Sequence, residues 1–214
     1  MSSITVRHDL RGQFGPARDQ GLRPTCLAFA TSDAHAAVRD TTWAELSCEY
    51  LYYQAVQREG VSHTAAVKFA SIREALDQDG QPVESGWPYL KVVPADAKKW
   101  KPPANVGDLF CRASKILVGS FGRAWQKVTS GTPVLIGMSI SDAFLDPKAG
   151  VVDSTEPVDP TRRHAVIAVA TGDRAGAKFL MVRNSWGAGW GLAGYAWIGE
   201  RYMKPRIMRM VTVN

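Results

Sequence analysis

The sequence predicts an α+β fold in which a helical first half is followed by a strand-rich second half. Residues 25–78 contain three runs that lack internal Gly and Pro and carry apolar side chains at helical spacing. From Ser114 onward the apolar residues form short runs rich in Val and Ile, bounded by Gly, Pro and polar residues, which is typical of strands. A stretch rich in Pro, Lys and Ala, residues 91–113, separates the two patterns. Helices and strands are therefore expected to be segregated along the chain.

Composition limits the class of protein. The chain has 214 residues and a mass of 23.4 kDa, enough for one sizeable core or for two half-domains that share a cleft. The net charge of +6 is scattered and forms no long basic stripe, so we expect no nucleic-acid partner. No apolar run approaches the roughly 18 residues of a membrane span. Residues 1–9 lack the apolar core of a signal peptide, which predicts a cytoplasmic protein or one released without a classical signal, unless a pro- or targeting region is missing.

The first half is expected to begin with an extended lead-in over residues 1–24, since its Gly and Pro residues disfavour a helix. The first helix is predicted from about Thr25 to Arg39, with small alanines facing a crowded interior. Ser47 is predicted to cap a second helix that stops near Gly60. A third helix is predicted from about Ala65 to Gln78.

The second half is expected to hold six strands and one short helix at about Arg123 to Ser130. The polar segment 141–163 is expected to be a long loop, which is uncommon unless the loop is functional or mobile. The predicted strands are Lys115–Val118, Val134–Ile140, Ala165–Ala170, Phe179–Arg183, Tyr195–Ile198 and Ile207–Val213.

Cys26 lies where the first helix is expected to begin. Pro24 and Thr25 suit a helix entrance, which places the sulfur near unpaired backbone N–H groups and the positive end of the helix dipole. Such an environment favours the thiolate, the attacking form of cysteine. The alternative is that Cys26 is a buried small apolar residue, as most cysteines without a disulfide are.

The other two cysteines, Cys48 and Cys111, are interpreted as structural thiols. Three cysteines make an odd count without a short-range pairing pattern, which is a poor disulfide framework. They also lack the spacing of metal ligands, so no metal and no cofactor are expected.

His164 heads a strand-like apolar run and lies 138 positions after Cys26. Twenty positions further on, Asn184 begins the block Asn-Ser-Trp-Gly-Ala-Gly-Trp-Gly. With Gln20 six positions before Cys26, these segments resemble the papain-like cysteine peptidases, in a bacterial-type form. The resemblance covers most of the chain, and the Asn-Ser-Trp block is its most specific part.

The resemblance implies a two-lobed fold with a helical N-terminal lobe, an antiparallel β-barrel-like C-terminal lobe and the active-site cleft between them. Residues 1–214 would form a single domain, with the helical lobe at about 20–111 and the β-rich lobe at about 112–214. The N-terminal lead-in and the C-terminal strand would cross between the lobes. Arg23 stands where secreted members usually carry a disulfide-bonded cysteine, and the usual inhibitory pro-segment is expected to be missing.

The resemblance also assigns roles. Cys26 would be the nucleophile, His164 the general base and acid, and Asn184 the group that orients the imidazole ring. Gln20 would donate to the oxyanion together with the Cys26 backbone N–H. Three further residues are expected to line the cleft: Ala165 in the main specificity pocket, Trp186 over the Asn–His hydrogen bond and Trp190 on the leaving-group side. Each of these residues could instead have an ordinary packing role.

Three functions remain open. The first is a cysteine-type peptidase, an endopeptidase that acts on a polypeptide through a Cys26 thioester. The second is an acyl-transfer or deamidating enzyme that uses the same three residues, and the third is a catalytically silent peptidase fold that serves as a binding module. The expected partners are a polypeptide substrate and a protein inhibitor or pro-segment. The protein is expected to be a monomer that does not associate with membranes.

Overall fold

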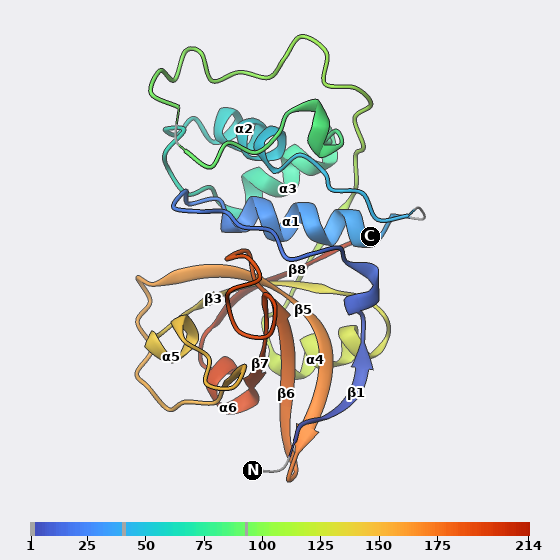
Figure 1. Ribbon diagram of the computed structural model, residues 1–214, viewed down its shortest axis with the longest axis vertical. Coiled ribbons are helices and arrows are strands. Elements are labelled where there is room, and N and C mark those ends of the chain that lie inside the picture. Colours follow the sequence, from blue (N-terminus) through green and yellow to red (C-terminus); the bar gives the residue numbers. More distant parts are fainter. Residues whose placement is uncertain (1–2, 40–41, 93) are drawn as a thin grey trace. The chain divides into compact units, whose positions relative to one another are not determined.

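The computed structural model describes residues 3–39, 42–92 and 94–214 and divides into two compact units (Figure 1). The helical unit comprises Gln20–Ser114 and Val213–Asn214, and the strand-rich unit comprises Met1–Asp19 and Lys115–Thr212. The predicted α+β class is therefore confirmed: helices α1 to α3 lie in the helical unit, and the strands lie in the other unit together with three shorter helices.

The helical unit is built around helix α1 (Cys26–Ala37), as the first run of small apolar residues predicted. Every residue from Leu27 to Ala36 is buried, including the polar His35. α1 packs against α2 (Cys48–Glu59) and α3 (Phe69–Gln78), and a 3-10 turn, Glu84–Gly86, follows. The alanine-rich sequence allows neighbouring elements to approach α1 closely on several sides.

The ends of α2 follow from local chemistry. The Ser47 hydroxyl accepts a hydrogen bond from the Tyr50 backbone N–H at 3.0 Å, which confirms the predicted cap. Gly60 ends the helix at φ 67°, a conformation that glycine adopts without steric cost. α3 begins at Phe69, later than expected, because the Glu59 carboxylate accepts from the Lys68 N–H at 2.8 Å and caps the helix there.

The strand-rich unit contains an eight-stranded sheet. Seven strands follow the order β2-β8-β3-β5-β6-β7-β4, and the eighth, β1, pairs with β5. β5 is antiparallel to β1, β3 and β6, β3 is antiparallel to β8, and β6 is antiparallel to β7, whereas β4 and β7 are parallel. The path ends at β2 and at β4, so the described strands form an open sheet; the barrel-like closure that we expected was wrong. The strands are β1 (Thr5–Asp9), β2 (Ser114–Leu117), β3 (Val134–Ser139), β4 (Val151–Val152), β5 (Arg163–Arg174), β6 (Ala177–Arg183), β7 (Tyr195–Gly199) and β8 (Ile207–Val213).

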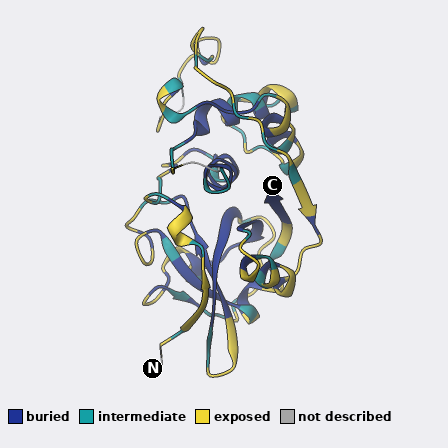
Figure 2. Ribbon diagram, turned by 90° about the vertical axis from the view of Figure 1, so that its right-hand side faces the viewer, coloured by how far each residue is buried: buried dark blue, intermediate teal, exposed yellow. Residues whose placement is uncertain are grey.

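β5 is the central strand of this sheet, because it pairs with β1, β3 and β6. Its residues from His164 to Thr171 are buried, whereas the hairpin that leads into β6 is exposed (Figure 2). Three helices accompany the sheet: α4 (Phe121–Thr129), α5 (Asp142–Leu145) and α6 (Glu200–Met203). The buried core of the unit draws on α4, α5 and α6 as well as on the sheet.

The segment 141–163 is more ordered than the predicted loop. It contains α5 and β4, and its Glu156 carboxylate accepts a hydrogen bond from the Ala143 N–H at 3.2 Å. The buried Arg206 side chain donates to the carbonyls of Glu156 and Pro157. Interactions between residues distant in sequence therefore fix a segment whose polar composition predicted a loop.

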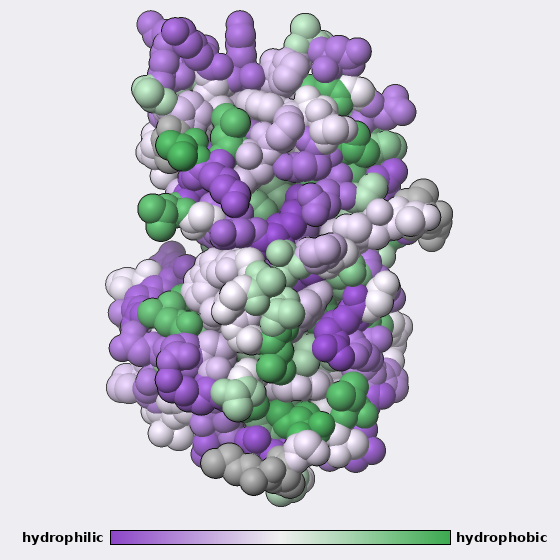
Figure 3. Space-filling view, viewed as in Figure 1, coloured by the Kyte–Doolittle hydropathy of each residue, from purple (hydrophilic) through white to green (hydrophobic). Residues whose placement is uncertain are grey.

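The surface is largely polar. Figure 3 shows hydrophobic side chains in small groups among hydrophilic ones on the visible face. Within the described ranges, no helix is long and apolar enough to cross a bilayer. All three cysteines are thiols, with Cys48 buried as expected; Cys111, however, is exposed, so its interpretation as a buried structural thiol was wrong.

A buried histidine in α1 predicts a pH-dependent stability. The His35 ring is 1% exposed and its Nδ1 lies 3.1 Å from Gln81 Oε1. Burial lowers the pKa of His35 from 6.5 to about 4. Between these values the unfolded chain binds more protons than the folded one, so stability is lost as the pH falls.

We expect His35 to account for a loss of about 2–3 kcal/mol in the free energy of unfolding between pH 7 and pH 4.5. Urea denaturation of the wild type and of His35→Gln at both pH values measures it. The variant should show the smaller loss, since glutamine does not titrate. Equal losses in both proteins would contradict this assignment.

Candidate active site

In the strand-rich unit, His164 and Asn184 form a buried pair. His164 lies at the start of β5 and Asn184 directly follows β6, the antiparallel neighbour of β5. This pairing of strands explains how residues 20 positions apart come into contact. His164 Nε2 lies 2.6 Å from Asn184 Oδ1, and the two residues are 6% and 2% exposed.

The hydrogen bond fixes the state of the imidazole ring. A carboxamide oxygen only accepts, so His164 Nε2 carries the hydrogen and Nδ1 is left as the basic nitrogen. Asn184 Oδ1 also accepts from the Ser185 backbone N–H at 2.8 Å, and the Asn184 N–H donates to Gly194 O at 2.9 Å. These contacts hold the amide with its oxygen toward the histidine.

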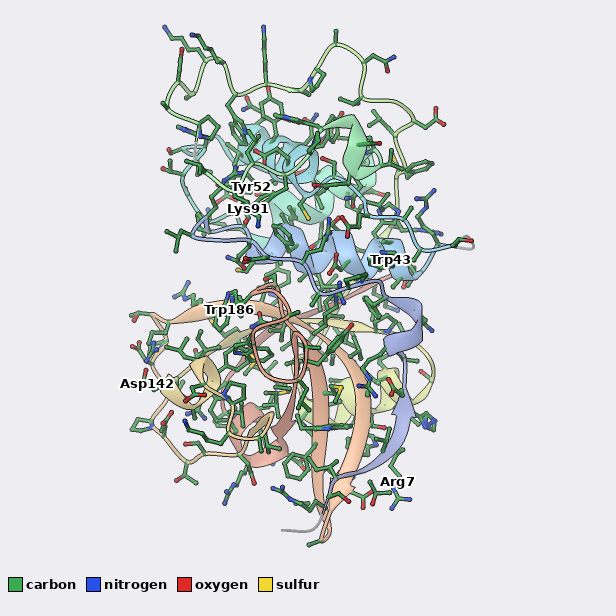
Figure 4. The ribbon with its side chains drawn as sticks, viewed as in Figure 1. Arg7, Trp43, Tyr52, Lys91, Asp142 and Trp186 are labelled. Atoms are coloured by element: carbon green, nitrogen blue, oxygen red, sulfur yellow. The ribbon has the colours of Figure 1, made fainter. Side chains whose placement is uncertain are left out.

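Aromatic side chains surround this pair. Trp186, labelled in Figure 4, lies in the strand-rich unit. Its ring centroid is 4.5 Å from that of His164, and the two ring planes are tilted by 34°. Phe144 from α5 stands edge-on to His164 at 5.9 Å and contacts Trp190 at 5.0 Å. The Trp190 indole N–H donates to the Phe144 carbonyl at 3.0 Å, which ties α5 to the block after Asn184. Low local polarity strengthens the His164–Asn184 hydrogen bond.

Phe144 was missed by the sequence analysis, which assigned it to a loop. A signal was present, since Phe144 is the only aromatic residue in segment 141–163. A lone aromatic side chain in a polar segment tends to anchor that segment on a core.

Burial sets the charge of the histidine. It lowers the pKa of His164 to about 4, and the hydrogen bond to Asn184 offsets only part of this effect. The two arginines that precede His164 in the chain have contacts of their own: Arg162 pairs with Asp142 at 2.8 Å, and Arg163 donates to Pro160 O at 2.8 Å. Near neutral pH, the imidazole is an uncharged base unless an anion approaches it.

Ala165 is also buried, at 4% exposed, and pairs with Gly137 of β3. Side chains alternate along a strand, so Ala165 points to the face opposite His164. Its expected place in a specificity pocket remains a prediction.

In the helical unit, Cys26 is the first residue of α1 and is partly exposed. The N-cap Thr25 makes no side-chain cap; its hydroxyl lies instead 2.7 Å from the Tyr89 hydroxyl. The first N–H groups of a helix lack intrahelical partners, so the start of this 12-residue helix has the positive potential that favours a thiolate.

Gln20 lies in the same unit, in the segment that leads into α1. It is 7% exposed, and its Nε2 donates to the Arg23 carbonyl at 2.8 Å. Among the predicted site residues, the structure thus gathers two groups. Gln20 and Cys26 belong to one short segment of the helical unit, and His164, Asn184, Trp186 and Trp190 form one cluster in the strand-rich unit.

The described part of the chain contains no cluster of three or more His, Cys, Asp or Glu residues placed to hold a metal ion. The groups available for chemistry are a thiol, an imidazole and two carboxamides. This set suits nucleophilic and acid–base catalysis.

The fold resembles that of solved cysteine proteases. Xylellain, a cysteine protease from Xylella fastidiosa, matches with a TM-score of 0.82 at 21% identity, covering 99% of this chain and 87% of that one. The Carica candamarcensis cysteine protease CMS1MS2, solved in complex with E-64, matches with a TM-score of 0.77 at 20% identity, covering 96% of each chain. At these identities the likeness establishes the papain-like fold.

Sequence comparison adds closer relatives. Cysteine proteinase 3 of Entamoeba histolytica is 30% identical in an alignment of 198 positions that covers 87% of this chain and 60% of that protein. The oryzain gamma chain of Oryza sativa subsp. japonica is 28% identical in an alignment of 191 positions that covers 86% of this chain and 51% of that protein. The chain thus spans about half to three fifths of the length of these relatives. Residues 2–213 match the model of the papain family of cysteine proteases, and the chain belongs to this family.

Proposed function

We propose that this protein is a cysteine peptidase that hydrolyses peptide bonds of polypeptide substrates through a thioester on Cys26. The observation that carries the proposal is the buried His164–Asn184 hydrogen bond of 2.6 Å, which leaves His164 Nδ1 as the basic nitrogen. Membership of the papain family and the partly exposed Cys26 at a helix start support the same reaction.

The proposed reaction begins with proton transfer from the Cys26 thiol to His164 Nδ1. Burial alone would hold the pKa of His164 at about 4, and a thiolate within hydrogen-bond reach would raise it. The resting pair is then a thiolate and an imidazolium. The mechanism therefore requires Cys26 and His164 to meet in the folded protein.

Acylation follows by attack of the sulfur on the substrate carbonyl carbon. As the tetrahedral intermediate collapses, the C–N bond breaks and His164 gives its proton to the leaving amine. Water then attacks the thioester with His164 as base, which releases the acid and restores the thiol. Cys26 and His164 supply the nucleophile and the proton transfers, so the proposed reaction uses no cofactor.

The remaining site residues orient the imidazole ring or stabilise the oxyanion. Asn184 holds the imidazole plane, and Gln20 with the Cys26 backbone N–H stabilises the oxyanion. Trp186 keeps water from the His164–Asn184 bond, and Trp190 shapes the leaving-group side of the site. We also propose that the small Ala165 leaves room for a bulky apolar substrate side chain. A monomeric state, control by a protein inhibitor or pro-segment, and a cytoplasmic or signal-independent location stay predictions.

The direct test is the modification of Cys26 by an epoxysuccinyl peptide, read by intact mass. The background is Cys111→Ser, because the exposed Cys111 thiol could also react. We expect one adduct, which Cys26→Ala abolishes and whose formation His164→Ala slows strongly.

Gln20→Ala should lower kcat/KM on a peptide substrate about 100- to 1,000-fold, as loss of an oxyanion donor does.

Product masses separate the candidate functions. Peptide hydrolysis adds one water and yields two shorter chains, one ending in a new acid and one beginning with a new amine. Acyl transfer leaves the acyl group on another amine, and deamidation keeps the chain intact and exchanges the ammonia of a side-chain amide for water. No adduct and no product from the folded wild type would overturn the proposal and favour a binding module.

The role of Trp186 predicts a change in the pKa of His164. Trp186→Ala opens the imidazole to water and weakens the burial that lowers its pKa. In a Cys26→Ala background, we expect the pKa of His164 to rise from about 4 toward 6.5, measured by NMR titration of the ring. Trp186→Phe, the matched control, keeps an aromatic cover and should raise it less. An unchanged pKa in Trp186→Ala would show that other groups bury the ring.

A further inference from the structure

The segment from Gln20 to Cys26 is tied to the helical unit by a buried ion pair. The side chains of Arg23 and Glu49 are 1% and 0% exposed, and the guanidinium donates to both carboxylate oxygens, at 2.5 and 3.0 Å. Arg23 also donates to the Leu90 carbonyl at 2.6 Å. Glu49 accepts further from the Trp100 indole N–H at 2.6 Å and from the Leu90 N–H at 3.1 Å. The pair thus forms part of a dense buried network.

A second tie is made by the Tyr89 hydroxyl. It donates to the Gln20 carbonyl at 2.8 Å and lies 2.7 Å from the Thr25 hydroxyl, so it joins the two ends of the segment. The Tyr89 ring packs edge-on against Phe29 of α1, with centroids 4.6 Å apart. One side chain therefore contacts the residue that bears the proposed oxyanion donor, the N-cap of α1 and the helix itself.

The geometry of the Gln20 amide depends on these ties. Gln20 Nε2 donates to the carbonyl of Arg23, whose side chain is held by Glu49. A carboxamide nitrogen carries two hydrogens at a fixed angle, so this bond restricts the directions open to the second N–H. Arg23, Glu49 and Tyr89 thus hold the backbone segment that carries both the Gln20 amide and the Cys26 backbone N–H.

Net stability is a poor explanation for such a pair. Replacing a buried ion pair by apolar residues of similar volume is often neutral or stabilising, because desolvation offsets the attraction. What the pair does provide is direction, since a bidentate guanidinium–carboxylate contact fixes both groups in one plane.

We propose that the Arg23–Glu49 ion pair and the Tyr89 hydroxyl are positioning elements for acylation, which set the Gln20 carboxamide against the nucleophile. This inference rests on the proposed function. The three residues act through Gln20 and the backbone of the segment. Their loss should affect the stabilisation of the oxyanion and leave the reactivity of the Cys26 thiol intact.

Two reactions of Cys26 distinguish these effects. Hydrolysis of a fluorogenic peptide passes through a tetrahedral oxyanion. Alkylation by iodoacetamide displaces iodide from a methylene carbon and forms no oxyanion, so its rate and pH profile report the thiolate alone. Both are measured in the Cys111→Ser background, with the alkylated site mapped by peptide mass.

The first variant is Tyr89→Phe, with Tyr52→Phe as the matched control. The Tyr52 hydroxyl donates to the carbonyls of His63 and Ala65, outside the segment, and phenylalanine keeps each ring beside the Arg23 guanidinium. We expect Tyr89→Phe to lower kcat roughly tenfold or more with little change in KM, because small misplacements of catalytic groups are costly. Tyr89→Phe should react with iodoacetamide at the wild-type rate. Tyr52→Phe should equal the wild type in both hydrolysis and alkylation.

The second variant replaces the ion pair by Arg23→Met together with Glu49→Met, which avoids leaving one buried charge alone. We expect a folded protein with lowered kcat and an unchanged alkylation rate. Its unfolding temperature should fall, because the buried Trp100 indole N–H loses its acceptor. If Tyr89→Phe and the double variant both hydrolyse the peptide with the same kcat as the wild type, the inference is wrong and the peptidase proposal is unaffected. A wild-type protein without hydrolysis and without reaction at Cys26 would overturn both.

Discussion

The hydrogen bond between His164 and Asn184 is the constraint on which the proposed chemistry depends. It joins the start of β5 to the end of β6, and at 2.6 Å beneath Trp186 it fixes both the ring plane and the tautomer of the histidine. The sheet contributes the register that brings the two residues together, and the aromatic cluster around Phe144 keeps them from water. The sheet register and the aromatic cluster thus both act on one group, the His164 imidazole, whose Nδ1 is the proposed proton acceptor.

Burial disfavours the imidazolium form of His164, so the proposed mechanism needs the Cys26 thiolate to stabilise it. It lowers the pKa of His164 to about 4, so the ring resists protonation unless an anion stabilises the imidazolium. A thiolate at the start of α1 would be such an anion, favoured in turn by the helix dipole. In this account each group of the pair is charged because the other is. The helical unit has the complementary task of holding Cys26 and Gln20 in fixed positions, for which the buried Arg23–Glu49 network is suited.

The sequence predicted those features that depend on local patterns. The Ser47 cap, the Gly60 stop and the strand at Ile207–Val213 were confirmed because capping chemistry and short runs rich in β-branched residues are encoded within a few residues. The family was confirmed because the Asn-Ser-Trp block is highly specific.

Features set by long-range contacts could not be read from the sequence. β1 forms because β5 offers it an edge, and its exposed residues Thr5–Asp9 show no apolar face. α5 depends on Phe144 reaching the aromatic cluster, and Arg23 meets Glu49 across 26 positions. The open sheet departs from the expected barrel because closure depends on how the end strands β2 and β4 pair, which no local pattern specifies.

The most direct measurement is the pKa of His164 in the wild type and in Cys26→Ala, from NMR titration of assigned ring resonances. The account predicts a value of about 4 in Cys26→Ala, where no thiolate can form, and a value raised by several pH units in the wild type. It also predicts that the wild-type titration coincides with that of the Cys26 thiol, as coupled groups require. A pKa of about 4 in both proteins, with the thiol titrating separately near its ordinary value of about 8.5, would contradict the proposed ion pair.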